Sequence, residues 1–235
     1  MITTVFFDLD GTLLPMDNDE FTKVYFKLLC KKLAPLGYSS EELVKAVWSG
    51  MAAMVKNDGA DSNEAVFWRE FEKVLGSKVL KDREFIDEFY INEFNEAKAV
   101  CGFDEKLVSL VHDLRSHGIK VVLATNPIFP SAATESRIRW AGFEPSVFEH
   151  YTTYENTSYC KPNPQYYQYL MEKVGVSPEE CIMIGNDALE DAAAEEAGMK
   201  VFLLTDNLIN KTDTDITRYP NGDVDALSGY LQSVI

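Results

Sequence analysis

The sequence is short of basic residues, and it contains no long apolar run. Lysine and arginine number 22 against 38 aspartates and glutamates, so the 235 residues carry a formal net charge of -16 at pH 7. Nucleic acids and anionic membranes attract proteins through basic patches, so this charge argues against both as partners. No apolar run approaches the roughly 20 residues of a transmembrane helix. A small anionic substrate remains compatible with the sequence where a metal and a lysine locally reverse the field.

Cysteine is also scarce, and the four cysteines show no paired motif. No C-x-x-C spacing joins Cys30, Cys101, Cys160 and Cys181. Disulfide frameworks and zinc sites usually show such pairing, so we expect free thiols in a reducing compartment. The first residues show neither the basic segment nor the apolar core of a secretory signal. Both observations favour a cytoplasmic protein.

The segment from 16 to 98 has the periodicity of helices throughout. Its first apolar residues follow the i, i+3, i+4, i+7, i+8 spacing of an amphipathic helix: Phe21, Val24, Tyr25, Leu28 and Leu29. Three further helical patterns follow, separated by short polar joints. We therefore predict an all-helical domain at 16–98, inserted into a core that comprises residues 1–15 and 99–235.

The core segment alternates between helices and apolar strands. A helix, a glycine stop and an apolar strand recur four times between residues 104 and 204. The predicted helices include one at 188–197, and the predicted strands include a short one at 147–152. A polar surface loop is predicted at 206–223. This alternation is typical of βαβ units, and it predicts an α/β fold with a doubly wound parallel sheet.

Two carboxylates follow the first apolar strand directly. Residues 5–7 form the end of this strand, and Asp8 and Asp10 come next, with Gly11 permitting a tight turn and Thr12 adding a hydroxyl. Two acids this close are costly unless a cation holds them. Mg²⁺ is the obvious cation, because it takes oxygen ligands and shares them with phosphate groups. The plain alternative is a strand that ends in a polar turn.

Three later stretches also carry polar groups, either directly after a predicted strand or directly before a predicted helix. Thr125 and Asn126 follow a strand and can donate to phosphate oxygens. Lys161 precedes a helix, where the helix dipole disfavours a lysine unless a negative group lies close by. Asp187 and Asp191 follow another strand, four residues apart, so a helix there would turn both toward one site. Each stretch alone also reads as a turn, an exposed loop or a helix cap. Their combination predicts one shared site, because ligands bind at the carboxyl ends of parallel strands.

Together the four stretches resemble the motifs of the haloacid dehalogenase (HAD) superfamily, and the resemblance covers essentially the whole chain. The matching segments, in motif order, are Asp8-Leu9-Asp10-Gly11-Thr12, Thr125-Asn126, Lys161-Pro162 and Gly185-Asn186-Asp187 with Asp191. Many members carry an acid directly after the glycine of the fourth motif, where this chain has Asn186. The helical insert resembles the C1-type cap of phosphoglycolate-phosphatase-like members. The resemblance thus implies a Rossmann-like core with a helical cap.

The resemblance also implies a phosphatase that hydrolyses a small phosphate monoester through an aspartyl-phosphate. Asp8 would be the nucleophile, Asp10 the general acid/base and Lys161 the third catalytic residue. Thr125, Asn126 and Thr12 would bind the substrate. The substrate would be a small phosphorylated metabolite.

The same match assigns the ligands of the Mg²⁺ cofactor. Asp8, the carbonyl of Asp10 and Asp187 would hold the ion, with Asp191 assisting from nearby. Which of the two acids after Gly185 completes the metal shell is left open. A metal-free dehalogenase is disfavoured, since that reaction has no use for the second acid of the first motif.

Three questions stay open at the level of the sequence. A phosphosugar mutase or other phosphotransferase uses the same four motifs, and a non-catalytic metabolite-binding protein could share the fold. The oligomeric state cannot be read from the chain. Substrate identity depends on the insert, where Met16, Asp17, Trp48, Met51 and Trp68 are candidates for the pocket, although aromatic residues at helical spacing are more often core.

Overall fold

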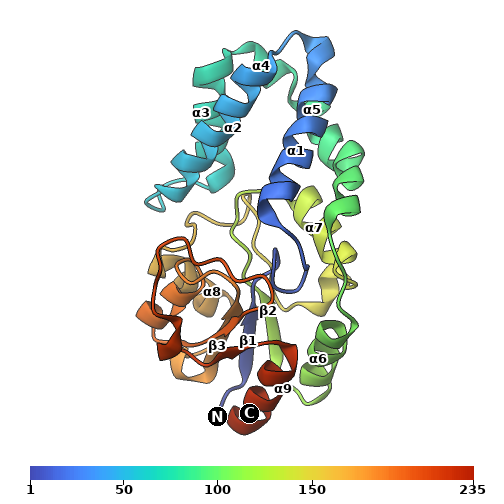
Figure 1. Ribbon diagram of the computed structural model, residues 1–235. Helices are drawn as coiled ribbons and strands as arrows, with labels where there is room; N and C mark the ends of the chain where they lie inside the picture. Colours follow the sequence, from blue (N-terminus) through green and yellow to red (C-terminus); the bar gives the residue numbers. More distant parts are fainter.

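The computed structural model describes residues 1 to 235, and it is built around one parallel β-sheet (Figure 1). The strands lie in the order β2-β1-β3-β4-β5, and every neighbouring pair is parallel. Their bounds are β1 (Thr4–Phe7), β2 (Lys120–Leu123), β3 (Cys181–Gly185), β4 (Lys200–Leu204) and β5 (Asn221–Gly222). The predicted α/β class is confirmed. Strand β1 lies between β2 and β3, where the strand order reverses and where doubly wound sheets bind ligands.

Helices cover both faces of the sheet because successive strand residues point into two separate cores. Val5 and Phe7 belong to one core, together with side chains of α6, α7 and α9, whereas Phe6 belongs to the other, with α8 and the 3₁₀-helix η5. Alternation of this kind follows from the two-residue period of a strand. The helix bounds are α6 (Glu105–Ser116), α7 (Ser131–Trp140), α8 (Pro164–Val174), η5 (Ala192–Ala197) and α9 (Val224–Val234).

Between β1 and α6 the chain forms only helices, which stand as a group beyond the carboxyl end of the sheet (Figure 1). Their bounds are α1 (Asn18–Leu33), η1 (Ala34–Leu36), α2 (Ser40–Val55), α3 (Asn63–Leu75), α4 (Lys78–Lys81), α5 (Arg83–Ile91) and η2 (Glu93–Val100). Ser39 caps α2 by accepting a hydrogen bond from the N–H of Glu42. None of the helices is both long and apolar enough to cross a membrane.

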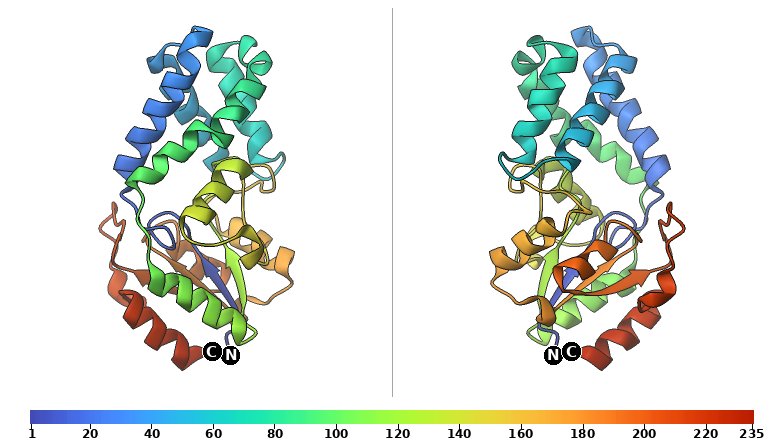
Figure 2. Two further views of the ribbon diagram at one scale, coloured as in Figure 1. Left: turned by 90° about the vertical axis from the view of Figure 1, so that its right-hand side faces the viewer. Right: turned by 90° about the vertical axis from the view of Figure 1, so that its left-hand side faces the viewer.

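Two connecting segments and a set of aromatic rings join the helical group to the sheet. Met16 and Cys101 form an isolated antiparallel bridge where the chain leaves and re-enters the core. Phe94 of η2 stacks on Trp140 of α7, with ring centroids 5.3 Å apart. The two termini lie side by side at the opposite end of the molecule (Figure 2). The helical group therefore contacts the core through the two connecting segments and through several aromatic pairs, which include Phe129 against Phe21 and Tyr25.

The strand predicted at residues 147–152 is wrong. The segment begins at the end of η3 (Pro145–Val147), and it forms a single isolated bridge with β2, between Tyr151 and Leu123. It runs beside β2 through three backbone hydrogen bonds, which Glu149 donates to Val121, Leu123 to His150 and Thr152 to Leu123, but no strand forms. Proline favours the turn that starts the segment. Thr152 then donates its hydroxyl to the carbonyl of Thr125, 2.5 Å away, so it supports the loop after β2 and does not extend a strand.

The helix predicted at 188–197 is confirmed only in its second part, because Ala192–Ala197 form the 3₁₀-helix η5 and residues 188–191 form turns. The carboxylate of Asp187 accepts the N–H groups of Leu189 and Glu190, each at 2.8 Å. Such bonds are typical of a helix N-cap, but here residues 188–191 form turns and the chain becomes helical only at Ala192. The polar loop at 206–223 contains two short elements, η6 (Ile216–Arg218) and β5, and η4 (Pro178–Glu180) precedes β3.

Candidate active site

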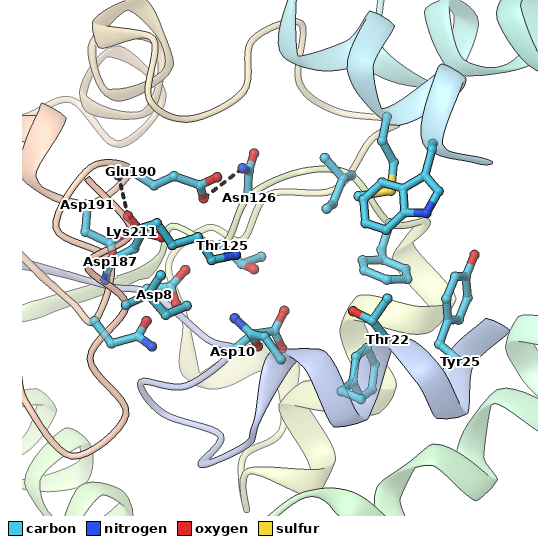
Figure 3. Close-up of a pocket in the computed structure, with 18 of the residues that line it drawn as sticks. Asp8, Asp10, Thr22, Tyr25, Thr125, Asn126, Asp187, Glu190, Asp191 and Lys211 are labelled. Atoms are coloured by element: carbon cyan, nitrogen blue, oxygen red, sulfur yellow. Dashed lines mark hydrogen bonds between the residues drawn. The ribbon is translucent and has the colours of Figure 1, made fainter. Parts of the chain in front are cut away.

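A pocket of about 240 Å³ lies over the carboxyl ends of β1, β2 and β3, facing the helical group (Figure 3). Polar side chains from the sheet loops line one end, and side chains of α1 and α2 line the other. The residues from the sheet loops are Asp8, Asp10, Thr125, Asn126, Asn186, Asp187, Glu190 and Asp191. The structure thus brings together most of the residues that the four sequence stretches supplied.

The turn after β1 places Asp8 on the floor of the pocket. The N–H of Asp8 still donates to the carbonyl of Ile184 in β3, at 2.9 Å, and so the strand positions the residue. Gly11 has φ +86, and a Cβ there would lie 2.2 Å from Nδ2 of Asn186. Only glycine fits this turn, because of the positive φ and because no space is left for a Cβ atom. Thr12 follows, and its hydroxyl donates to Oδ1 of Asn186 at 3.2 Å, so it braces the turn and does not line the pocket.

Lys161 joins two of the carboxylates beneath the pocket. Its Nζ lies 2.8 Å from Oδ1 of Asp8 and 2.6 Å from Oδ1 of Asp191, and Lys161 and Asp191 are both only 1% exposed. Burial lowers the pKa of Lys161, but the charges of Asp191 and Asp8 outweigh this effect and raise the pKa well above its ordinary value. Lys161 therefore stays charged and holds Asp8 in place.

Asp191 supports this lysine with both of its oxygens. While Oδ1 accepts from Lys161, Oδ2 accepts the N–H of Asp187 at 2.9 Å. A Cβ on Gly185 would lie 2.0 Å from Oδ2 of Asp191, so the close approach of Asp191 to the end of β3 requires glycine there. Because both oxygens of Asp191 have partners, Asp191 is placed to position Lys161.

Electrostatically the pocket carries an excess of negative charge. Burial raises the pKa of Asp8 to about 8, even though Lys161 opposes the shift, and the nearby charges of Asp191 and Asp10 raise it further. Burial likewise raises the pKa of Glu190 to about 7. These shifts mean that burial, which disfavours the charged form of a carboxyl group, outweighs the positive charge that Lys161 supplies.

Arg137 is a site residue that the sequence reasoning missed. Its side chain is completely buried on α7, and Nη1 forms an ion pair with Oδ2 of Asp10. Nε donates to the carbonyl of Ala133 at 3.3 Å, and the guanidinium lies 4.4 Å from the ring centre of Phe129. The other oxygen of Asp10, Oδ1, is buried and has no hydrogen-bond partner. One oxygen of Asp10 is thus held by the core, and the other is left for a ligand.

A weak signal for Arg137 was present in the sequence. In α7 the residues at 133, 134, 138 and 141 are small or apolar and share one helix face, and Arg137 occupies the same face. A charged residue on a face that is otherwise apolar is almost never buried without a partner. The partner, Asp10, is 127 residues away in sequence, so the pattern alone could not identify it.

Thr125 and Asn126 lie in the loop that follows β2, at the edge of the pocket. The carbonyl of Thr125 accepts from the hydroxyls of Thr152 and Tyr166, which fixes the loop. The side-chain amide of Asn126 is already engaged, since it donates to Glu190 at 2.9 Å and accepts the N–H of Lys161 at 3.3 Å. The backbone N–H of Asn126 donates to no backbone carbonyl. Asn126 therefore offers its backbone to the pocket more readily than its side chain.

Unpaired backbone donors also follow β1. The N–H groups of Leu9 and Asp10 donate to no backbone carbonyl. Successive free N–H groups in a turn form a concave binding site for anions. Together with the N–H of Asn126 and the hydroxyl of Thr125, they supply donors around the carboxylate of Asp8.

The donor set fits Mg²⁺. No three carboxylate, histidine or cysteine side chains converge closely enough to bind a metal by themselves. Mg²⁺ typically uses one or two carboxylates and completes its shell with waters and substrate phosphates. Five carboxyl groups line the pocket, and Lys211 is the one cation that lines it with them. The excess of carboxyl groups over cations in the lining and the oxygen ligands that they supply therefore suit a hard dication.

Comparison with known proteins relates the chain to phosphatases of low sequence identity. It is 27% identical to the putative pyrophosphatase PpaX of Clostridium perfringens over 203 residues, which is 85% of this chain and 82% of the relative. It is 24% identical to the glyceraldehyde 3-phosphate phosphatase of Methanothermobacter thermautotrophicus over 228 residues, which is 92% of this chain and 95% of the relative.

The fold and the family model agree with these relatives. A crystal structure of a HAD phosphatase from Thermococcus onnurineus superimposes with a TM-score of 0.62 at 20% identity, covering 98% of both chains. The family resemblance inferred from the motifs is confirmed by the family model, which covers most of the chain. This model, haloacid dehalogenase-like hydrolase, matches residues 2–207, and the protein therefore belongs to this family of hydrolase enzymes.

Proposed function

We propose that the protein is a Mg²⁺-dependent phosphatase that hydrolyses a small phosphate monoester through a phosphorylated Asp8. The observation that carries this proposal is the placement of the Asp8 carboxylate, which Lys161 holds at 2.8 Å beneath a pocket with free backbone donors. A carboxylate so held is a competent nucleophile for phosphorus if charge is neutralised. The relatives are named as a putative pyrophosphatase and a glyceraldehyde 3-phosphate phosphatase, and both names support phosphoryl chemistry.

In the first step an oxygen of Asp8 attacks phosphorus, and the bond from phosphorus to the substrate oxygen breaks. Asp10 gives its proton to the departing alkoxide, using the oxygen Oδ1 that has no protein partner. In the second step Asp10 takes a proton from water, which attacks the same phosphorus. The bond to Asp8 breaks, free phosphate leaves, and both carboxyl groups return to their starting states.

The remaining residues would stabilise the charge of the phosphoryl group and keep it in position. Lys161 and the hydroxyl of Thr125 would stabilise the phosphoryl oxygens, and the free N–H groups of Leu9, Asp10 and Asn126 would bind the same oxygens. Asp8, Asp187 and the carbonyl of Asp10 would hold Mg²⁺. When bound, the ion would neutralise the phosphoryl group and polarise it. Asp191 would act through Lys161.

We further propose that residues 16–98 form a cap on a core of residues 1–15 and 99–235. The pocket supports this division, because α1 and α2 line the end that faces the sheet loops. Closure of such a cap excludes bulk water from the phosphoryl group. The four free cysteines support a cytoplasmic location.

Activity is tested by a screen of phosphorylated metabolites with excess Mg²⁺, scored by released phosphate. We expect release from at least one small monoester, and we expect a chelator to abolish it. Release that persists unchanged in a chelator would contradict the metal assignment. Binding without release from any monoester would contradict the phosphatase proposal.

Separate alanine variants of Asp187 and Asp191 distinguish the two acids after Gly185. We expect Asp187→Ala to weaken Mg²⁺ binding by about tenfold or more in calorimetric titration. Asp191→Ala should lower kcat with a smaller change in Mg²⁺ affinity, because Lys161 loses a partner 2.6 Å away. If Asp191→Ala alone loses Mg²⁺ affinity, Asp191 is the ligand and Asp187 is not.

Arg137→Met tests whether Arg137 positions Asp10. We expect kcat/KM, which reports the first step, to fall about 10- to 100-fold for an alkyl phosphate, whose alcohol needs a proton, and less for p-nitrophenyl phosphate, whose phenolate does not. Arg139→Met on the same helix is the control, since Arg139 is half-exposed and pairs with Glu135 and Glu144 at the surface. A purely structural role predicts an equal loss on both substrates. Arg137→Lys should restore part of the difference.

A further inference from the structure

The end of the pocket opposite Asp8 is an apolar wall, which we define as Tyr25, Phe26, Trp48, Met51, Ile128 and Phe129. It is built from α1, α2 and the loop after β2, so both the helical group and the core contribute. Figure 3 shows the carboxylates at one end of the pocket and Tyr25 at the other, with Asp10 and Thr22 between them. A phosphoryl group bound over Asp8 would direct the rest of the substrate toward this wall.

The rings of the wall form a connected surface. Phe26 lies between Tyr25 and Trp48, with ring centroids at 5.1 and 5.6 Å, and Tyr25 meets Phe129 edge-on at 5.4 Å. The hydroxyl of Tyr25 bonds to that of Tyr90 at 2.9 Å. That bond satisfies the hydroxyl outside the pocket, so Tyr25 contributes its ring to the lining.

The wall is not simply closed core. Trp48 is 48% exposed, although large apolar side chains usually pack when a partner is present. Beside the wall lies a second crevice, of about 20 Å³, and it shares Tyr25, Met51, Ile128 and Phe129. All but one of its lining residues are apolar. The apolar surface therefore continues from the wall into the space between the helical group and the core.

The wall has no cation to receive a second anion, because its six residues are uncharged. Lys211 is the only cation that lines the pocket, whereas five carboxyl groups line it. A pyrophosphate or a phosphorylated acid would place a second anionic group near the wall with one lysine to receive it. The volume of about 240 Å³ is at the small end for ligand pockets, which suits a phosphate and one ring.

We propose that the natural substrate is a phosphate monoester whose alcohol carries one planar aromatic ring, as in a nucleoside monophosphate, and that Phe26 and Trp48 hold this ring. The proposal rests on the phosphatase function above and names its substrate class. Base–aromatic stacking tolerates many ring types, so the wall predicts the class and not one compound.

The first test compares substrates with the same leaving oxygen. Uridine 5′-monophosphate and ribose 5-phosphate differ by the base, and 2-phenylethyl and 2-cyclohexylethyl phosphate differ by planarity. We expect kcat/KM to favour the ring-bearing member of each pair by about tenfold or more. Equal kcat/KM within the first pair would overturn the proposal, and equality within the second would show that the wall selects bulk and not an aromatic ring.

Variants connect this preference to the wall. Trp48→Ala should reduce the ratio of kcat/KM within each pair by about fivefold or more. Val55→Ala is the matched control, because Val55 lies on the same helix, is 43% exposed and does not line the pocket. A ratio that both variants leave unchanged would contradict the role of the wall.

Binding separates this proposal from the proposed function. Dissociation constants for 2-phenylethylphosphonate and ethylphosphonate, measured with Mg²⁺ by calorimetry, need no turnover. Tighter binding of the phenyl compound by about tenfold is expected. If this preference holds and no monoester is hydrolysed, the phosphatase function fails while the ring site stands. If monoesters are hydrolysed and the two phosphonates bind equally, the ring site fails alone.

Discussion

Replacing Asp8 by asparagine is expected to abolish turnover while the fold persists. The amide cannot attack phosphorus, so kcat should fall to below about one part in 10⁴. Asparagine has nearly the shape of aspartate, and its carbonyl oxygen can still accept a hydrogen bond from Lys161, which also keeps its ion pair with Asp191. Phosphate release under excess Mg²⁺ measures the loss, and circular dichroism with thermal unfolding checks the fold.

The conservative control for this variant is Asp113→Asn. Asp113 is an exposed acid on α6, far from the pocket lining, so the same chemical change there should leave kcat within about twofold. A folded Asp8→Asn variant with near-normal phosphate release would refute the nucleophile assignment.

Asp10→Asn is expected to lower kcat for an alkyl phosphate by about 10²- to 10⁴-fold, because asparagine cannot transfer the proton in either step. A leaving group that needs no proton should allow the rates of the two steps to be measured separately. The phenolate of p-nitrophenyl phosphate leaves without a proton, so its first turnover should stay fast while the later ones become slow. Rapid-mixing measurements of nitrophenol should then show a burst close to one equivalent of enzyme. Equal losses on both substrates, with no burst, would contradict the acid/base role of Asp10.

The sequence predicted the parallel sheet well because local signals repeat at every βαβ unit. Asn163 caps α8 by accepting the N–H of Gln165, and Gly175 ends the helix in the left-handed conformation, as both residue types favour. The local signals were less reliable in the segment after β3. Asp187 accepts the N–H groups of Leu189 and Glu190, as the N-cap of a helix would, yet the chain becomes helical only at Ala192.

The sequence named most of the residues that line the candidate site, but it did not predict most of the contacts between them. The order of the motifs predicted that Asp8, Lys161 and Asp191 share one site. The structure shows that Lys161 forms ion pairs with both acids. Arg137 was missed because its contact with Asp10 depends on how α7 packs against the loop after β1. Thr12 was expected at the substrate, but its hydroxyl reaches Asn186, because the turn at Gly11 directs it toward the end of β3.

The most direct test of the central claim is to trap the phosphorylated residue. Asp10→Asn is mixed with p-nitrophenyl phosphate and Mg²⁺, quenched during the burst and reduced with borohydride, which converts an acyl phosphate into an alcohol. Peptide mass spectrometry then locates the modified residue. Phosphorylation of Asp8 predicts homoserine at position 8 in the presence of substrate, and none without it. Nitrophenol release with position 8 unmodified, or modification at Asp187 or Asp191, would contradict the mechanism.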